Sequence, residues 1–222
     1  MTVALEVVAD ASAAARRVAE LLAERAREAV ASRGRFTLAV SGGATPSEMF
    51  RALGEEEVPW VETTVYQVDE RVVPAGHPDR NLTHLLATLP PAAHGSVHPM
   101  PVDDRDLERA AARYAAELPA HLDLVHLGLG TDGHTASLVP GDPVLDVRDR
   151  TVALTNEYQG FRRMTITVPV IDAAREIVWL VTGREKQDAL TRLLAGDSSI
   201  PAARISNPRQ LVVADAGAVP AL

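Results

Sequence analysis

Short apolar runs alternate with longer amphipathic stretches along this chain of 222 residues. Most of the runs are continuously apolar, which is typical of strands that are buried on both faces of a sheet. The pattern predicts strands at residues 3–8, 36–40, 63–68, 122–127, 164–168, 177–181 and 211–213.

Helical periodicity fills the intervals between these runs. Residues 12–31 place Val18, Leu21 and Leu22 on one stripe, and residues 107–118 and 185–195 are also periodic, the last followed by Gly196. Alternating strands and helices predict an α/β fold: a mainly parallel sheet with helices on both faces, in a Rossmann-like three-layer sandwich. No linker divides the chain, so residues 1–222 are expected to form one domain.

Composition narrows the range of partners. The chain is 46% hydrophobic but only 4% aromatic, so its core must consist mainly of Ala, Val and Leu. A net charge of −8 and the lack of a Lys/Arg block argue against binding to nucleic acid or to an anionic membrane. An anion can still bind in a local pocket of backbone N–H groups and a few cations.

The residue inventory excludes further classes. The chain has no cysteine, which rules out disulfides, thiolate catalysis and cysteine-based zinc sites. His77, Asp79, His94 and His98 have no metal-binding helical spacing, so no metal is expected. The N-terminus has no basic region followed by a long apolar run, and we expect a cytoplasmic protein.

The loop after residues 122–127 contains the clearest candidate for catalysis. Gly130 and Gly133 allow a tight turn and a close approach to a ligand, and Asp132 and His134 add an acid and a base. His134 is expected at the start of a short helical segment, where positive potential favours the neutral imidazole that a general base requires. We predict a catalytic role for His134.

The sequence matches two familiar motifs only in part. Gly128, Gly130 and Gly133 spell the dinucleotide pattern G-x-G-x-x-G, yet Pro140 and Pro143 prevent the long helix that must follow it. The sequence A-V-S-G-G at 39–43 lacks the first glycine of the serine-hydrolase elbow, and no late histidine follows a suitable acid.

Residues 41–46, S-G-G-A-T-P, predict a phosphate cradle. Thr45 can cap a helix whose first position is Pro46, and Glu48 completes a capping box. The free N–H groups at such a helix start, after a glycine turn, bind phosphate. An ordinary capped turn fits equally well, and without a Walker lysine the hydrolysis of nucleoside triphosphates is not indicated.

Charged residues follow two other strands. Asp69 and Arg71 lie at the mouth of the strand at 63–68, where they face either a polar cleft or solvent. Asn81 is expected to cap the next helix. Arg163 precedes the strand at 164–168, and Lys186 lies at a helix start, where its charge opposes the helix dipole unless an anion binds nearby.

Taken together, these motifs resemble the 6-phosphogluconolactonase family from Phe36 almost to the C-terminus. The matching stretches are S-G-G-A-T-P at 41–46, V-D-E-R-V-V-P at 68–74 with His77, Asp79 and Asn81 beyond it, the glycine-rich loop at 128–141, R-M-T-I-T at 163–167 and V-T-G-R-E-K at 181–186. Arg80 departs from the family, which usually has a small residue there.

The resemblance implies hydrolysis of 6-phospho-D-glucono-1,5-lactone in the oxidative pentose phosphate pathway, without cofactor or metal. His134 would activate water, and Asp69 and Arg71 would line the sugar end. The oxyanion donor stays open between Arg71 and N–H groups near Gly130. The residues expected to bind substrate are Ser41, Gly42, Gly43, Thr45, Asn81, Gly130, Asp132, Gly133, Arg163 and Lys186.

Two alternatives stay open. Glucosamine-6-phosphate deaminases look similar, but they carry an acid five residues after the histidine, where this chain has Val139, and a tyrosine in place of Arg71. A non-enzymatic sugar-phosphate sensor would need a DNA-binding helix pair, for which the chain has no spare segment. The sequence leaves the oligomeric state open between monomer and dimer.

Overall fold

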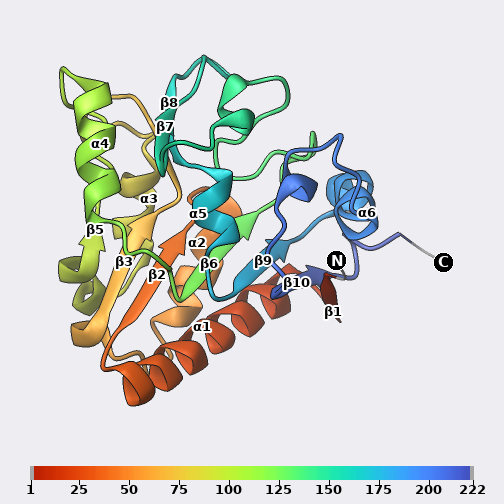
Figure 1. Ribbon diagram of the computed structural model, residues 1–222. Helices are drawn as coiled ribbons and strands as arrows, with labels where there is room; N and C mark the ends of the chain where they lie inside the picture. The colour runs from red at the N-terminus through yellow and green to blue at the C-terminus, as the bar shows by residue number, and fades with distance from the viewer. Residues whose placement is uncertain (1–2, 221–222) are drawn as a thin grey trace.

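A parallel sheet of seven strands lies at the centre of the computed structural model, which describes residues 3–220 except for the side chains of Ala44 and Thr45 (Figure 1). The strand order is β1-β10-β9-β6-β2-β3-β5, and all the neighbouring pairs are parallel. The strands are β1 (Ala4–Val8), β2 (Phe36–Val40), β3 (Thr63–Gln67), β5 (Val97–His98), β6 (Leu124–Gly128), β9 (Ile177–Val181) and β10 (Gln210–Asp215).

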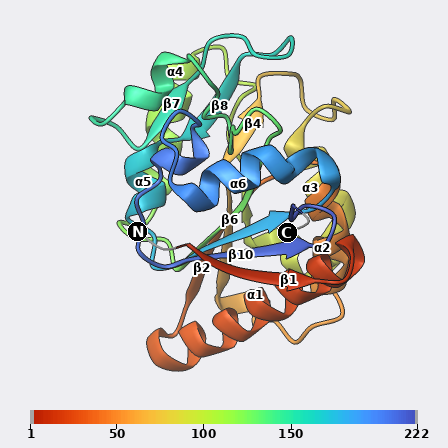
Figure 2. The ribbon, with the colours of Figure 1, turned by 90° about the vertical axis from the view of Figure 1, so that its right-hand side faces the viewer.

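Helices cover both faces of this sheet (Figure 2). On one face lie α1 (Ala11–Arg33), α2 (Ala44–Leu53) and α3 (Asn81–Thr88), and on the other lie α4 (Leu107–Glu117), α5 (Val168–Asp172) and α6 (Gln187–Ala195). An apolar core fills the space on each side. The predicted three-layer α/β architecture is therefore confirmed.

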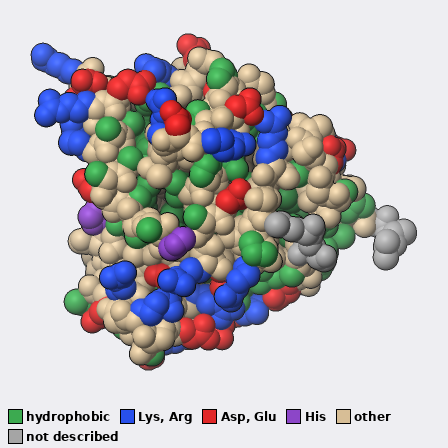
Figure 3. All heavy atoms as spheres, in the orientation of Figure 1, with side chains coloured by type: hydrophobic (Ala, Val, Ile, Leu, Met, Phe, Trp, Pro, Cys, Tyr) green, Lys and Arg blue, Asp and Glu red, His purple; other side chains and the backbone are tan. Residues whose placement is uncertain are grey.

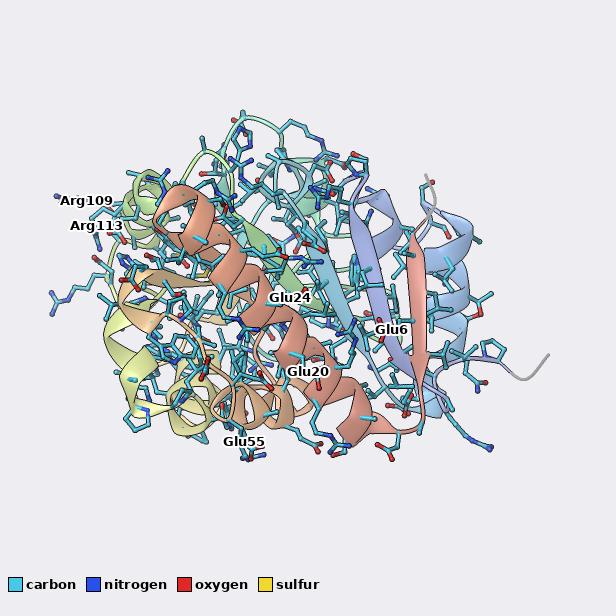
Figure 4. All side chains as sticks on the ribbon, turned by 90° about the horizontal axis from the view of Figure 1, so that it is seen from below. Glu6, Glu20, Glu24, Glu55, Arg109 and Arg113 are labelled. Atoms are coloured by element: carbon cyan, nitrogen blue, oxygen red, sulfur yellow. The ribbon has the colours of Figure 1, made fainter. Side chains whose placement is uncertain are left out.

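The longest helix, α1, shows how the small residues are used. Asp10 caps it by accepting a hydrogen bond from Ala13 N at 2.8 Å, and Gly34, at φ +72°, ends it. Alanines along its buried stripe let the helix pack close to the strands, while Glu20 and Glu24 project from its outer side (Figure 4).

A second, antiparallel sheet lies beside the main one. It contains β4 (Asp69–Arg71), β8 (Arg163–Ile166) and β7 (Val152–Leu154), in the order β4-β8-β7. Two predictions are corrected here: residues 69–71 form a strand and not a loop, and the run at 164–168 belongs to this small sheet. A continuous apolar run reports burial on both faces, and it does not identify the sheet.

The crossover connections leave a crevice between β2 and β6. From β2 the chain continues to β3 on one side, whereas the strand that follows β6 in the main sheet, β9, lies on the other. Loops at the carboxyl ends of these two strands therefore diverge. Such a switch point is where open α/β sheets bind ligands.

The surface carries both signs of charge. Basic and acidic side chains are interspersed over the face drawn in Figure 3. Within residues 3–220, no helix has the length and apolar character that crossing a membrane requires.

Candidate active site

A cavity of about 190 Å³ opens at the carboxyl ends of β2, β6 and β9. The structure gathers residues there from five separate parts of the sequence, as the motifs predict. The predicted site residues that line this cavity are Ser41, Gly42, Gly43, Asp69, Arg71, Asn81, Gly130, His134, Arg163 and Lys186.

His134 is paired with Asp132, which lies behind it rather than on the cavity wall. Nδ1 of His134 is 2.6 Å from Oδ1 of Asp132, and the same oxygen accepts the backbone N–H of His134 at 3.1 Å. Because an ionised carboxylate can only accept, Nδ1 carries the proton, and in the neutral imidazole the lone pair is then on Nε2. This is the tautomer that a general base needs at Nε2.

The environment keeps Asp132 ionised. Its partial burial raises its pKa, but hydrogen bonds from Tyr158 and from His134 outweigh this and lower the pKa below its usual range. The predicted helical segment at His134 is absent, since residues 131–138 form turns joined by a bridge between Thr135 and Leu138. The carboxylate therefore orients the imidazole, and no helix begins at His134.

Two glycines in this loop have different functions. A Cβ on Gly130 would overlap the His134 ring, so only glycine lets the imidazole lie against this backbone. Gly133 has φ +81° and packs against Ile200. It shapes the turn and is not among the residues that line the cavity.

The start of α2 forms the opposite wall. Ser41 follows β2 and donates its backbone N–H to His126 O at 3.1 Å. The N-cap of α2 is Gly43, at φ +116°, so the predicted capping by Thr45 with Pro46 in the first position is wrong. Only the backbone of Thr45 is described, and its expected contact with substrate stays a prediction. Gly43 has no side chain to cap the helix, which leaves its first N–H groups for a ligand.

Three cations converge on the cavity. Arg71 and Arg163 are directly opposite each other on β4 and β8, and the Nε of each is buried and has no partner among the described residues. Burial lowers the pKa of Arg163; Asp69 acts against this shift, and Arg71 adds to it. Lys186 joins them as the N-cap of α6. Like charges on neighbouring strands repel, and a bound anion would relieve that repulsion.

Asp69 lies fully buried beneath the two arginines. Its Oδ2 accepts the Ser137 hydroxyl at 2.5 Å, and its Oδ1 accepts Nδ2 of Asn81 at 3.2 Å. Burial raises the pKa of Asp69, against the effect of Ser137 and of the arginines. Asp69 is thus a carboxyl whose ionised form is disfavoured by its surroundings.

Asn81 does not cap α3 as predicted. It is the first residue of that helix, and its Oδ1 accepts a hydrogen bond from Arg71 at 2.9 Å. The capping group is the carboxylate of Glu70, which accepts the N–H groups of Asn81 and Leu82 at 2.7 and 2.8 Å. Buried Arg80 lies 3.5 Å from Glu70 and compensates its charge.

Sequence reasoning missed several residues of the site, including Tyr158 beside the Asp132–His134 pair and Thr135 and Thr182 on the cavity wall, and it placed His126 only in the core. The hydroxyl of Tyr158 donates to Oδ2 of Asp132 at 2.7 Å. No motif marks this tyrosine, and only tertiary structure brings it to a residue 26 positions earlier. His126, predicted to be structural, is fully buried and also borders the cavity.

Residues 9–214 match the family described as "Glucosamine-6-phosphate isomerases/6-phosphogluconolactonase". The chain belongs to this family. The resemblance predicted from the sequence motifs is confirmed.

Individual members of the family agree with this assignment. A 6-phosphogluconolactonase from Synechocystis sp. is 40% identical over 187 residues, which cover 78% of each chain. The crystal structure of a 6-phosphogluconolactonase from Shewanella baltica superposes with a TM-score of 0.84 at 25% identity, over 96% of this chain and 98% of the other. A monomeric glucosamine-6-phosphate deaminase reaches the same TM-score at 19% identity, over 97% and 98%. The fold is thus common to both branches of the family, and side chains must distinguish them.

Proposed function

We propose that this protein is a metal-independent carboxylic ester hydrolase that converts 6-phospho-D-glucono-1,5-lactone to 6-phosphogluconate. The observation that carries the proposal is the Asp132–His134 pair, held at 2.6 Å, whose imidazole lines the same cavity as Arg71, Arg163 and Lys186. A phosphorylated lactone needs this combination, because it carries an anion and an ester carbonyl. No group of three His, Asp or Glu residues suited to a metal occurs in the described part of the chain.

The phosphate would bind at Ser41, Gly42, Gly43 and Thr45, where the N-terminus of α2 offers N–H groups. Arg163 and Lys186 would balance its charge. Asp69, Arg71 and Asn81 would then border the sugar ring.

His134 would act through Nε2 as the general base. It takes a proton from water as the water oxygen attacks the lactone carbonyl carbon, and the carbonyl oxygen becomes an oxyanion. Arg71 or N–H groups near Gly130 would stabilise this oxyanion. When the intermediate collapses, the bond to the ring oxygen breaks and that oxygen receives the proton held by His134.

The test is a stopped assay on purified protein with freshly generated lactone or glucosamine 6-phosphate, each with and without a chelator. We expect lactone loss above the spontaneous rate, unchanged by chelator, and no ammonia from the amino sugar. Ammonia release would instead assign the protein to the deaminases, and activity lost to chelator and restored by zinc would contradict the metal-free mechanism.

The deaminase alternative has one argument in its favour, the equal structural similarity to a deaminase. Against it, the position five residues after His134 is Val139, which is buried and cannot transfer a proton. A sugar-phosphate sensor would not require the base-and-acid pair at residues 132 and 134. The single domain over residues 1–222, the cytoplasmic location and the oligomeric state, monomer or dimer, stay predictions.

A further inference from the structure

Tyr158 is the first residue of a tight chain reversal between β7 and β8. Its backbone exchanges two hydrogen bonds with Phe161, at 3.0 and 3.2 Å, across Gln159 and Gly160. Gln159 has φ +51°, a conformation that non-glycine residues seldom adopt. The reversal is thus a defined structure, and it directs the Tyr158 side chain to the Asp132–His134 pair.

The Tyr158 hydroxyl and His134 share the two oxygens of one carboxylate. Oδ2 of Asp132 accepts the hydroxyl at 2.7 Å, and Oδ1 accepts Nδ1 of His134 at 2.6 Å. Burial and the neighbouring Asp132 raise the pKa of Tyr158 to about 12, so the phenol stays a donor at neutral pH. With both oxygens engaged, the carboxylate cannot rotate away from the imidazole without losing a hydrogen bond.

The aromatic ring makes a separate contact with the cations. The Arg163 guanidinium carbon lies 5.1 Å from the ring centroid, within cation–π range. Nη2 of Arg163 also donates to the backbone carbonyl oxygen of Tyr158 at 3.3 Å. The ring also meets the His134 ring edge-on at 5.5 Å. One side chain therefore touches both the base and a cation of the same cavity.

We propose that Tyr158 is a positioning residue for lactone hydrolysis: its hydroxyl holds Asp132, and through it the Nδ1–H tautomer of His134, while its ring holds Arg163. This inference rests on the proposed function and adds a residue that the sequence motifs do not contain. The two parts of the side chain have different roles: the hydroxyl supports the chemical step, and the ring supports anion binding.

Paired substitutions test this separation. Tyr158→Phe keeps the ring, and we expect kcat to fall about tenfold with KM within about twofold, the scale of losing a partner that orients a catalytic ligand. Tyr158→Leu removes the ring as well and should also raise KM. Tyr66→Phe is the matched control, because it deletes a tyrosine hydroxyl that is bonded to the backbone oxygen of Glu117, and neither residue lines the cavity. It should leave both constants unchanged.

A double-mutant cycle identifies the route of the effect. In the Asp132→Asn background, Tyr158→Phe should cost less than about twofold, because the carboxylate through which the hydroxyl acts is gone. A full tenfold loss in that background, or an unchanged kcat for Tyr158→Phe alone, would overturn the proposal. Thermal unfolding of each variant checks that it is folded.

A spectroscopic measurement separates this inference from the proposed function. The Nδ1 proton of His134 should give a downfield resonance in nitrogen-15-labelled protein without substrate, and Tyr158→Phe should broaden it by faster exchange with water. If the wild-type protein shows this signal and fails to hydrolyse lactone, only the assigned reaction is wrong. If the signal is identical in Tyr158→Phe, the positioning role is wrong.

Discussion

Asp132 and Asp69 lie in the same site, and their surroundings move their pKa values in opposite directions. Asp132 is partly exposed and receives hydrogen bonds from His134 and Tyr158, so its pKa is lowered. Asp69 is fully buried, and desolvation raises its pKa. One carboxylate is thereby kept charged beside the base, and the other is held at a cost in stability.

Removal of the base tests the residue assigned to the chemical step. We expect His134→Ala to lower kcat by about 10² or more, the usual scale for a general base, while affinity for 6-phosphogluconate stays nearly unchanged. Steady-state kinetics and a product titration measure the two effects. Normal turnover with weakened product binding would show that His134 is a binding residue.

Asp69→Asn should make the protein more stable and less active. The pKa of Asp69 is higher in the folded state than in the unfolded chain. Its contribution to stability is therefore complete below the unfolded-state pKa and is lost as pH rises through the folded-state pKa. The charged form of this carboxyl therefore opposes folding, and does so increasingly as pH rises. With its oxygen facing Asn81 and its NH2 donating to the Ser137 hydroxyl, the amide can keep both contacts, so we expect a higher Tm at pH 7. We also expect a lower kcat/KM for the lactone, because Asp69 would border the sugar ring.

A lower Tm for Asp69→Asn would contradict this account of burial. It would mean that attraction from Arg71 and Arg163 outweighs the desolvation of the carboxylate. Repeating the melts at acidic pH separates the two cases, because the advantage of the amide should shrink as Asp69 itself becomes protonated.

At the scale of elements, Glu70 connects β4 to α3. One oxygen accepts the N–H groups of Arg71 and Asn81, and the other accepts Leu82 N and Nε2 of Gln67. The carboxylate is fully buried and faces donors on both oxygens. It thereby fixes the start of α3, and with it the Asn81 side chain above Gly42, where a Cβ would collide.

Glu70→Gln should therefore destabilise the protein although it is nearly isosteric. In either orientation, the amide NH2 faces two donors and leaves buried groups unpaired. We expect a loss of about 2–3 kcal/mol in the free energy of unfolding, measured by urea titration. Glu55→Gln, at an exposed position labelled in Figure 4, is the control and should change stability by less than about 0.5 kcal/mol. Equal stability of both variants would rule out the capping role.

Sequence patterns located most helices and strands but not the shortest strands or the strands they pair with. The strands β2 and β9 match their predicted bounds, and α1, α4 and α6 differ from theirs by one or two residues. The strands β4, β5 and β7 were missed. These strands have two or three residues each, too few for a period to be recognised, and their pairing depends on segments far away in the chain.

Across the whole molecule, stability should depend on pH through His126. Desolvation lowers the pKa of this fully buried imidazole to about 4, and neither ring nitrogen has a partner in the part of the chain that the structure describes. Because the pKa of His126 is lower in the folded state, the contribution of the neutral imidazole to stability is complete above the unfolded pKa of 6.5. This contribution is lost as pH falls through about 4. The loss should reach roughly 3 kcal/mol.

His126→Leu, a substitution of similar volume, should reduce this loss on acidification. It should also stabilise the protein at pH 7, because an unpaired buried N–H costs about 1–3 kcal/mol. The measurement is the free energy of unfolding at several values between pH 7 and 4. His84→Gln, at an exposed position, is the control. An unchanged pH dependence in His126→Leu would show that other groups cause the acid sensitivity.

The sequence by itself determined the α/β class, the glycine-rich loops and most of the side chains on the cavity, because periodicity and turn chemistry are local properties. Tertiary structure decided which groups meet. It placed Arg71 opposite Arg163, gave the capping of α3 to Glu70 and brought Tyr158 to Asp132. These contacts depend on strand pairing and chain reversal between distant segments, and no local pattern of residues encodes them.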